Sequence, residues 1–487
     1  MATVIGVDCS TQATKVEVRD TTSGALVSSG RAAHPPTRPP RSEQDPQAWW
    51  SALRDAVGRA CANPVVARSV TGMAVAGQQH GLVTLDAQRR VIRPAKLWND
   101  TESSADAGWL LDQLGGPEAW AEACGSVPTA AFTITKLSWL HRVEPDNFDA
   151  LEHVLLPHDW LTAMCSGALV TDRGDASGTG YWSPAEERWR TDLLEIVSPD
   201  KPWKEMLPRV LGAAEAAGTA TAGFTRALGL PDGIVVGAGT GDNMASALGL
   251  GAAAGDVMVS IGTSGTVFTV SSTPCVDPSG LVAGFADATD RYLPLVGTNN
   301  ATRVTDAFGR LLGVDAQTLA ETALSADPGA GGLVVVPHLD GERAPYRPHA
   351  SGLMIGIRSD VTRAQVARAA FEGVVNGLLD ALDALRAVCP AAGTEGRTLL
   401  VGGGARSPAY RRILADLSGL ALTVPAAPES VATGACVQAA AIVEGRRPED
   451  VAASWDLGPP ITVEPDERVQ RDAIRAAYVA ARDVSGS

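Results

Sequence analysis

The sequence feature that most restricts the fold is a pattern that occurs twice. Residues 4–19 and residues 257–270 each contain an apolar segment, a short turn of small and hydroxyl-bearing residues, and a second strand-like segment. Such strand, turn and strand patterns predict β-hairpins. The two copies lie about 250 residues apart, which is far too long a period for a solenoid repeat. The duplication therefore predicts two related α/β lobes.

The length of the chain supports the same division. A chain of 487 residues exceeds what one hydrophobic core usually supports, so two domains are expected. We predict an N-terminal lobe at 1–248, a C-terminal lobe at 257–445, and a segment at 446–487 that packs on the lobes. Residues 249–256 are rich in glycine and alanine, which predicts a hinge between the two lobes.

Composition and charge argue against several classes of partner. The formal net charge of −15 argues against a nucleic-acid partner, which would need a basic surface. No apolar run is long enough to cross a bilayer, so no membrane partner is expected. The seven cysteines form no C-x-x-C pair, which is typical of a reducing compartment and predicts a cytoplasmic protein. The sequence leaves open whether the chain forms a homodimer.

One carboxylate lies on a glycine-rich turn. Asp242 follows the apolar run 234–236 and the turn 237–241, and it precedes a helix-like segment at 244–248. Open α/β sheets bind ligands outside the carboxyl ends of their strands, so this position suits a catalytic carboxylate. The alternative is that Asp242 only caps the helix while the glycines permit a tight turn. The motif alone does not decide between these two roles.

Further polar side chains follow two other predicted strands. Gln79 and His80 come directly after the strand at 72–76, and Trp98 and Asp100 come after a strand-like segment that ends at Leu97. Amide, imidazole and carboxylate groups beside an aromatic ring suit a sugar, which needs hydrogen bonds to its hydroxyls and an apolar surface against its carbons. A buried histidine and a core tryptophan are the structural alternatives.

Two turns have the character of phosphate or nucleotide sites. The first hairpin carries Asp8, which could hold a hydrated magnesium ion, and Lys15, which together with nearby hydroxyls could contact phosphate oxygens. In the C-terminal half, the strand at 398–401 leads into three glycines at 402–404, which would let the backbone approach a flat ligand such as adenosine. An ordinary surface turn is the alternative in both places. Neither a P-loop nor a Rossmann glycine pattern is present.

Other segments have local structural expectations. Residues 31–41 are rich in proline and are expected to be irregular, and residues 157–161 and 172–179 are expected to be loops near a cleft. Thr362 and Gln365 form a capping box that predicts the start of a long helix.

Taken together, the motifs resemble those of the FGGY carbohydrate kinases. The resemblance is carried, in family order, by residues 6–8 with 10–11, 43–46 with 49–50, 77–81, 97–100, 241–243, 262–265, 341–343 and 402–406. It implies two actin-like, ribonuclease-H-like lobes with a nucleotide and sugar cleft between them. It also implies phosphorylation of a sugar by ATP, with D-xylulose as the expected acceptor and another ketose or polyol, such as ribulose or glycerol, as the alternative.

The resemblance also implies roles for individual residues. The N-terminal lobe is expected to bind the sugar and the C-terminal lobe to bind ATP. The implied roles are Asp242 as catalytic base, Asp8 as the carboxylate near Mg²⁺, Thr11, Lys15 and Thr263 as phosphate contacts, Gly403 and Gly404 as the adenosine loop, and Gln79, His80, Trp98, Asp100 and Asn243 as the sugar-binding set. Gln79 stands where methionine is commoner in the most similar family members.

Phosphoryl transfer requires mainly alignment and charge neutralisation, so the protein must align a sugar hydroxyl with the γ-phosphate and accept its proton. We expect Asp242 to take that proton. Two other classes of function compete with this interpretation: a sugar-binding protein without turnover, and a chaperone ATPase of the actin-like group. A carboxylate at the phosphoryl acceptor argues against the first, and the set Gln79, His80 and Trp98 argues against the second.

Overall fold

The computed structural model describes residues 2–347, 349–427 and 429–484. The chain forms two compact units, and each is built from three separate stretches. Unit 1 contains Met1–Ala252, Ser272–Leu293 and Glu429–Leu457, and unit 2 contains Ala253–Ser271, Pro294–Pro428 and Gly458–Ser487. The units therefore do not follow contiguous halves of the sequence, because the chain returns to unit 1 after most of unit 2 is complete.

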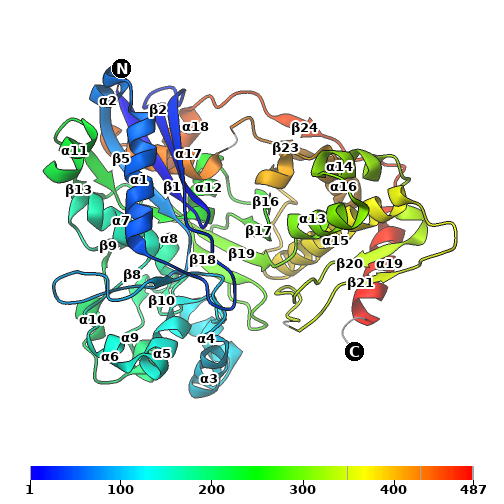
Figure 1. The fold of residues 1–487 in the computed structure, drawn as a ribbon, viewed down its shortest axis with the longest axis horizontal. Helices are drawn as coiled ribbons and strands as arrows, with labels where there is room; N and C mark the ends of the chain where they lie inside the picture. Colours follow the sequence, from blue (N-terminus) through cyan, green and yellow to red (C-terminus); the bar gives the residue numbers. More distant parts are fainter. Residues whose placement is uncertain (1, 348, 428, 485–487) are drawn as a thin grey trace. The chain divides into compact units, whose positions relative to one another are not determined.

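The centre of unit 1 is a mixed sheet (Figure 1). Its strands lie in the order β13-β14-β5-β1-β2-β3, and β15 also pairs with β5. They are β1 (Thr3–Cys9), β2 (Ala13–Asp20), β3 (Leu26–Ala33), β5 (Val70–Gly77), β13 (Ala216–Thr219), β14 (Val235–Gly237) and β15 (Thr240–Gly241). β1 is antiparallel to β2 and parallel to β5, so the first hairpin predicted from the sequence is confirmed.

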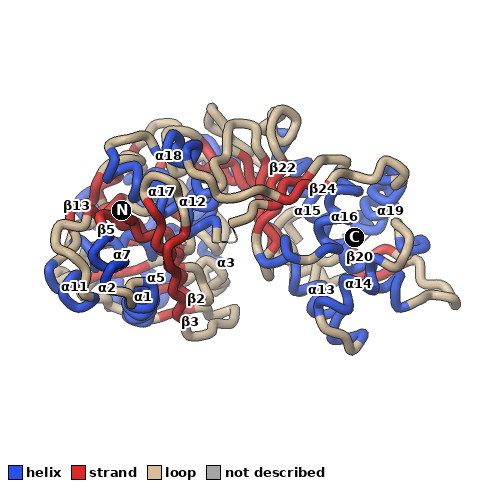
Figure 2. Tube along the Cα trace, turned by 90° about the horizontal axis from the view of Figure 1, so that it is seen from above, coloured by secondary structure: helices blue, strands red, loops and turns tan. Residues whose placement is uncertain are grey.

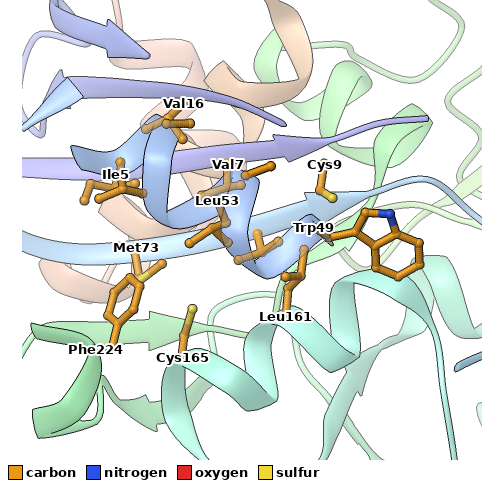
Figure 3. Packing of buried hydrophobic residues seen from close by; sticks show 14 of the residues in the cluster. Ile5, Val7, Cys9, Val16, Trp49, Leu53, Met73, Leu161, Cys165 and Phe224 are labelled. Atoms are coloured by element: carbon orange, nitrogen blue, oxygen red, sulfur yellow. The ribbon is translucent and has the colours of Figure 1, made fainter. Parts of the chain in front are cut away.

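Two helices cover opposite faces of this sheet. Alternate residues of a strand point to opposite faces, and a Cβ atom at Gly6 would lie 2.0 Å from the carbonyl oxygen of Ala432 in α17 (Ser430–Glu444). Ile5 and Val7 point the other way and share a core with Leu53 of α1 (Pro46–Ala60), as Figure 3 shows. In Figure 2, α17 and α1 lie on opposite sides of the red strands of this sheet. A side chain at Gly6 would push α17 away.

The remaining elements of unit 1 surround this core. The helices are α2 (Pro64–Ser69), α3 (Ser104–Leu114), α4 (Pro117–Cys124), α5 (Thr133–Val143), α6 (Pro145–Asp149), α7 (Pro157–Ser166), α8 (Arg173–Ala176), α9 (Thr191–Val197), α10 (Trp203–Met206), α11 (Ala222–Leu228), α12 (Asp242–Gly249) and α18 (Pro448–Ser454). The short strands are β4 (Glu43–Gln44), β6 (Val83–Leu85), β7 (Ala95–Lys96), β8 (His153–Leu155), β9 (Val170–Asp172), β10 (Trp182–Ser183), β11 (Arg188–Trp189), β12 (Arg209–Leu211) and β18 (Ala283–Ala286).

Unit 2 repeats the arrangement of a hairpin beside a parallel strand. β16 (Val257–Ile261) is antiparallel to β17 (Gly265–Thr269) and parallel to β22 (Thr398–Val401). The first two residues of β19 (Tyr292–Thr298) are assigned to unit 1 and the rest to unit 2. The other elements are α13 (Thr302–Leu312), α14 (Ala316–Leu324), η1 (Ala330–Gly332), β20 (Val334–Val336), β21 (Leu353–Ile355), α15 (Arg363–Val388), η2 (Gly403–Arg406), α16 (Pro408–Ser418), β23 (Leu422–Val424), β24 (Ile461–Val463) and α19 (Arg471–Val484). The second predicted hairpin is thereby confirmed.

Local predictions are partly confirmed. α15 begins with the predicted capping box of Thr362 and Gln365. The prediction that residues 31–41 are irregular is wrong at its start, because β3 extends to Ala33 and pairs there with Ala13. The two predicted loops are also wrong in part, because 157–161 begin α7 and 172–179 contain α8. In α7, Asp159 accepts a hydrogen bond from the N–H of Leu156, the N-cap residue directly before Pro157.

Two further findings concern the cysteines and the hydropathy of the helices. All seven cysteines are free thiols. No helix in the described part of the chain combines the length and the apolar character needed to cross a bilayer.

Candidate active site

Three strands of unit 1 end at the same edge of the sheet. Asp8 near the end of β1 lies beside Ala76 of β5, and Thr240 of β15 lies beside the same Ala76. All three strands run in the same direction, so the residues that follow them emerge together. The predicted residues Gln79 and Asp242 follow two of these strands directly. The register of the sheet thus brings together side chains that are far apart in the sequence.

Asp242 is the first residue of α12 and is half-buried. Its Oδ1 accepts hydrogen bonds from the backbone N–H and the side-chain Nδ2 of Asn243, at 2.8 Å and 3.0 Å. Burial raises the pKa of Asp242 to about 7, and the nearby charges of Asp8 and Asp175 act in the same direction. A carboxylate with this pKa can exchange a proton near neutral pH.

The side chains of Gln79 and Asn243 hold each other in defined orientations. Asn243 Nδ2 donates to Gln79 Oε1 at 2.8 Å, which fixes the direction of the Gln79 amide. Gln79 is 5% exposed, and its Nε2 has no hydrogen-bond partner within the described chain. A buried donor without a partner is costly, so this amide is suited to a ligand that brings an acceptor.

Asp8 offers a second buried atom without a partner. The side chain is 2% exposed, and its Oδ1 accepts no hydrogen bond from the described residues. Burial raises its pKa to about 6, although the nearby Lys15 ammonium acts in the opposite direction. An unpaired carboxylate oxygen at a strand end fits a hydrated divalent cation, which prefers oxygen ligands.

Lys15 lies directly across the hairpin from Asp8. Its Nζ is 2.6 Å from Glu429 Oε2 and 3.4 Å from Asp8 Oδ2. Burial would lower the pKa of Lys15, but the two carboxylates outweigh that effect and raise it. The predicted phosphate contact is therefore a charged lysine that already has two acidic neighbours in this structure.

Thr11 and Trp98 form one connected group. The Trp98 indole Nε1 donates to Thr11 Oγ1 at 2.9 Å, and that hydroxyl donates to Gln78 Oε1 at 3.2 Å. Trp98 is half-buried. This chain of hydrogen bonds connects the turn of the first hairpin to the residues that follow β5.

His80 is fixed by a backbone carbonyl and by aromatic rings. It adopts a left-handed backbone conformation, with φ of 65°. Its Nδ1 donates to the Gly178 carbonyl at 2.6 Å, and its ring stacks on Phe132 with the centroids 4.9 Å apart. Because a carbonyl can only accept, Nδ1 carries the proton in the neutral ring and Nε2 carries the lone pair.

Asp100 has a different environment from the other predicted sugar-binding residues. It is 0% exposed, and its oxygens accept hydrogen bonds from Lys96 Nζ, the Ser42 N–H and the Glu102 N–H. Glu43, Asp100 and Glu102 bring their carboxylates close enough to suit a metal ion, but the Lys96 ammonium lies 3.3 Å from Glu43 and 3.1 Å from Asp100. This cluster is a buried ion-pair network that holds the loop after β7.

In unit 2, the predicted nucleotide residues also lie at neighbouring strand ends. The turn that holds Thr263 is bonded to the start of α13. The N–H of Ala301, the residue before the helix, donates to the Thr263 carbonyl at 3.2 Å, and the Thr302 N–H donates to the Gly262 carbonyl at 2.9 Å. A Cβ atom at Gly404 would lie 2.3 Å from Ile261 Cγ2, so the glycine loop packs closely against the end of β16. Gly403 is exposed, and a Cβ atom there would meet nothing closer than Arg406 at 3.9 Å.

Sequence reasoning did not assign a role to the buried cluster around His158. The Nδ1 of His158 is 2.7 Å from Asp175 Oδ2, and its Nε2 is 3.1 Å from Asp159 Oδ1. Burial would lower the pKa of His158, but these carboxylates raise it to about 9. Asp172 also belongs to the cluster and accepts a hydrogen bond from Thr240 Oγ1 at 2.6 Å. The segment 172–179 contains three charged residues but the segment 157–161 contains only one, so local composition gives little indication of the cluster.

Comparison with known proteins agrees with this arrangement. Residues 3–249 match the N-terminal domain of the FGGY family of carbohydrate kinases, and residues 257–442 match its C-terminal domain. A xylulose kinase of Streptomyces coelicolor is 45% identical over 469 residues, which cover 95% of this chain and 93% of that protein.

Solved structures show the same fold. The crystal structure of xylulose kinase from Bifidobacterium adolescentis has a TM-score of 0.84 at 38% identity and covers 99% of both chains. Gluconate kinase from Lactobacillus acidophilus has a TM-score of 0.91 at 22% identity, covering 100% of this chain and 99% of that one, which shows the fold alone. Both domain matches together span most of the chain, so the protein belongs to the FGGY family of carbohydrate kinases and is an ATP-dependent sugar kinase.

Proposed function

We propose that the protein transfers the γ-phosphate of ATP to the terminal 5-hydroxyl of D-xylulose. The observation that carries this proposal is the grouping of Asp242, Asp8 and Gln79 at one edge of the unit 1 sheet. Asp242 brings a carboxylate with a pKa of about 7. Asp8 brings a buried oxygen and Gln79 a buried amide nitrogen, and neither atom has a hydrogen-bond partner among the described residues. The choice of sugar draws on the xylulose kinase of Streptomyces coelicolor.

Asp242 is the proposed general base. Both hydrogen bonds from Asn243 go to its Oδ1, so Oδ2 is the oxygen expected to accept the proton of the sugar hydroxyl. The position at the first residue of α12 favours the ionised form, because the helix dipole is positive at that end. The raised pKa makes this carboxylate a stronger base than an ordinary aspartate, and a base that titrates near the working pH is efficient.

Asp8 is the proposed protein contact for a magnesium ion. Its Oδ1 is the unpaired oxygen that fits such an ion or one of its water ligands. When bound, magnesium would neutralise charge on the phosphates during transfer. Lys15 and Thr11 in the same hairpin, and Thr263 in unit 2, are the proposed phosphate contacts, with Gly403 and Gly404 beside the adenosine.

The proposed sugar site selects hydroxyls by their positions. Gln79 Nε2 supplies a donor, and the orientation of the His80 ring places its lone pair on Nε2, which can accept from a hydroxyl. Asn243 and Trp98 complete the set, whereas Asp100 acts through the loop that it holds, because its oxygens are already hydrogen-bonded. A site with buried polar groups rejects a sugar that leaves them unpaired.

The experiment is a coupled assay of ADP release with D-xylulose, D-ribulose, L-ribulose, glycerol and gluconate. D-xylulose should give the highest kcat/KM, and the His80→Ala variant should raise KM for the sugar more than it lowers kcat. A higher kcat/KM for another acceptor would show that D-xylulose is not the preferred substrate, although the protein would still be a sugar kinase. An enzyme that released ADP equally fast with and without every acceptor would contradict the proposed reaction itself.

A further inference from the structure

The turn that precedes Asp242 is held by a side chain from the far end of the sequence. Gln438 lies on α17 and is 1% exposed. Its Oε1 accepts a hydrogen bond from the Gly239 N–H at 2.9 Å, and its Nε2 donates to the Gly239 carbonyl at 3.1 Å. A single amide therefore pairs with both polar backbone groups of one residue, as a neighbouring strand would.

Gly239 needs such a partner because the sheet does not provide one. β14 ends at Gly237 and β15 begins at Thr240, so Gly239 lies in the interruption between two short strands. A buried backbone N–H or carbonyl without a partner is costly. Gln438 satisfies both groups at the point where the chain leaves one strand and begins the next.

The other side of Gly239 is equally constrained. Its φ is +82°, and a Cβ atom would lie 2.5 Å from His158 Cδ2 and 2.5 Å from the Val75 carbonyl. The residue is thus enclosed between the Gln438 amide, the imidazole of His158 and the backbone of β5. The turn has no room to shift toward β5, and the two hydrogen bonds prevent it from shifting away.

We propose that Gln438 is a positioning residue for phosphoryl transfer, acting through Gly239 to hold Asp242 at the required place. The inference rests on the proposed role of Asp242 as general base. Only Thr240 and Gly241 separate Gly239 from Asp242, and both of these residues pair with β5. A movement of about 1 Å at a catalytic group can lower turnover about 100-fold.

The decisive variant is Gln438→Met, which keeps the length of the side chain and removes both hydrogen bonds. We expect kcat to fall about 10- to 100-fold while KM for sugar and for ATP changes less than about threefold. The matched control is Thr433→Val on the same helix, which removes a buried hydrogen bond to Glu17 Oε2 at 2.9 Å, away from the turn. The control should lower Tm and leave kcat at the wild-type value.

A double-mutant cycle with Asp242→Asn separates positioning from general loss of structure. If Gln438 acts by placing the carboxylate, adding Gln438→Met to Asp242→Asn should leave the residual turnover unchanged. An equal fractional loss in both backgrounds, or wild-type kcat in the single variant, would overturn the inference alone. Wild-type turnover in Asp242→Asn would overturn the proposed base, and the inference with it.

Gln438→Glu is the second variant, for the case that the methionine variant does not fold. The introduced carboxyl group can make both hydrogen bonds when protonated but loses the donor when ionised. The ratio of its kcat to that of the wild type should therefore be near one at low pH and fall as pH rises. A ratio that stays constant with pH would contradict the positioning role.

Discussion

The two hairpins of this protein share a backbone plan and differ in chemistry. In each unit the first strand of the hairpin pairs in parallel with a strand from much later in the chain, β1 with β5 and β16 with β22. The second-to-last residue of the first strand is Asp8 in unit 1, where it faces Lys15, and Ser260 in unit 2, where it faces Thr266. The same geometry therefore presents charged groups in one unit and hydroxyl groups in the other.

This difference agrees with the proposed division of roles between the two units. Unit 1 places ionisable groups with raised pKa values, Asp8 and Asp242, at its strand ends. Unit 2 places a hydroxyl and exposed glycine backbone at the corresponding edge, with Thr263 and Gly403 as the clearest cases. Substitutions at the edge of unit 1 should therefore change turnover, and substitutions at the edge of unit 2 should change nucleotide affinity.

The largest effect is expected for Asp242→Asn in unit 1. Loss of a positioned general base should lower kcat by about 10² to 10⁴-fold and leave KM for ATP nearly unchanged. At pH 8 the variant should also have a higher Tm. The raised pKa means that ionised Asp242 is less favourable in the folded protein than in the unfolded chain, and asparagine removes that cost. Steady-state assays and thermal unfolding at pH 8 measure both effects, and a folded variant with wild-type kcat would contradict the assignment.

The second prediction compares equivalent positions of the two hairpins. Asp8→Asn should lower kcat on the order of 100-fold and raise the magnesium concentration needed for half-maximal rate, because the proposed metal ligand is lost. Ser260→Ala, at the equivalent position of unit 2, should change kcat less than about threefold, because this substitution removes only a hydroxyl group and no charge. Magnesium titrations of both variants test this contrast. Equal effects at the two positions would remove the proposed division of roles.

The third prediction concerns two adjacent glycines of unit 2. Gly403→Ala adds a methyl group in open space, so Tm should be unchanged, but KM for ATP should rise about tenfold if adenosine lies against this backbone. Gly404→Ala places its methyl group 2.3 Å from Ile261 Cγ2 and should instead lower the free energy of unfolding by about 1–3 kcal/mol. Nucleotide kinetics and denaturant unfolding separate the two effects. An unchanged KM in Gly403→Ala would place the adenosine elsewhere.

The smallest effect is a shift in pH dependence. Because the base must be ionised, kcat/KM should fall as pH drops below the Asp242 pKa of about 7. The charge of Asp175 contributes to that raised pKa, after burial and Asp8, so Asp175→Asn should move the acidic limb to lower pH by less than about one unit. Asparagine can still accept the hydrogen bond from His158 Nδ1, which limits structural change. A shift to higher pH would contradict the electrostatic link.

Two regions of unit 1 differ in how well they can be predicted from the sequence. Asp8, Gln79 and Asp242 each follow an apolar strand-like run, and the rule that parallel strands end at one edge is enough to predict that they meet. Residues 157–161 are expected to form a loop, whereas the structure has a helix there with Pro157 at its start. The polar residues of α7 are buried in an ion-pair cluster, which no local pattern indicates.

Gln438 could not be predicted at all. It lies in an alanine-rich helix, 199 residues from Gly239, and nothing in its local sequence distinguishes it from a surface glutamine. Its partners are backbone groups, which carry no side-chain signature. Only the tertiary packing of α17 against the first sheet gives this residue its role.

The return of α17 to unit 1 has a consequence for the order in which the protein forms during synthesis. The face of β1 at Gly6 is synthesised long before α17, the helix that covers it, which is completed at Glu444. Domains usually fold on the ribosome from the N-terminus onward. One face of the first sheet therefore stays uncovered until α17 has emerged, so unit 1 begins before unit 2 and is completed only after most of unit 2 has been synthesised.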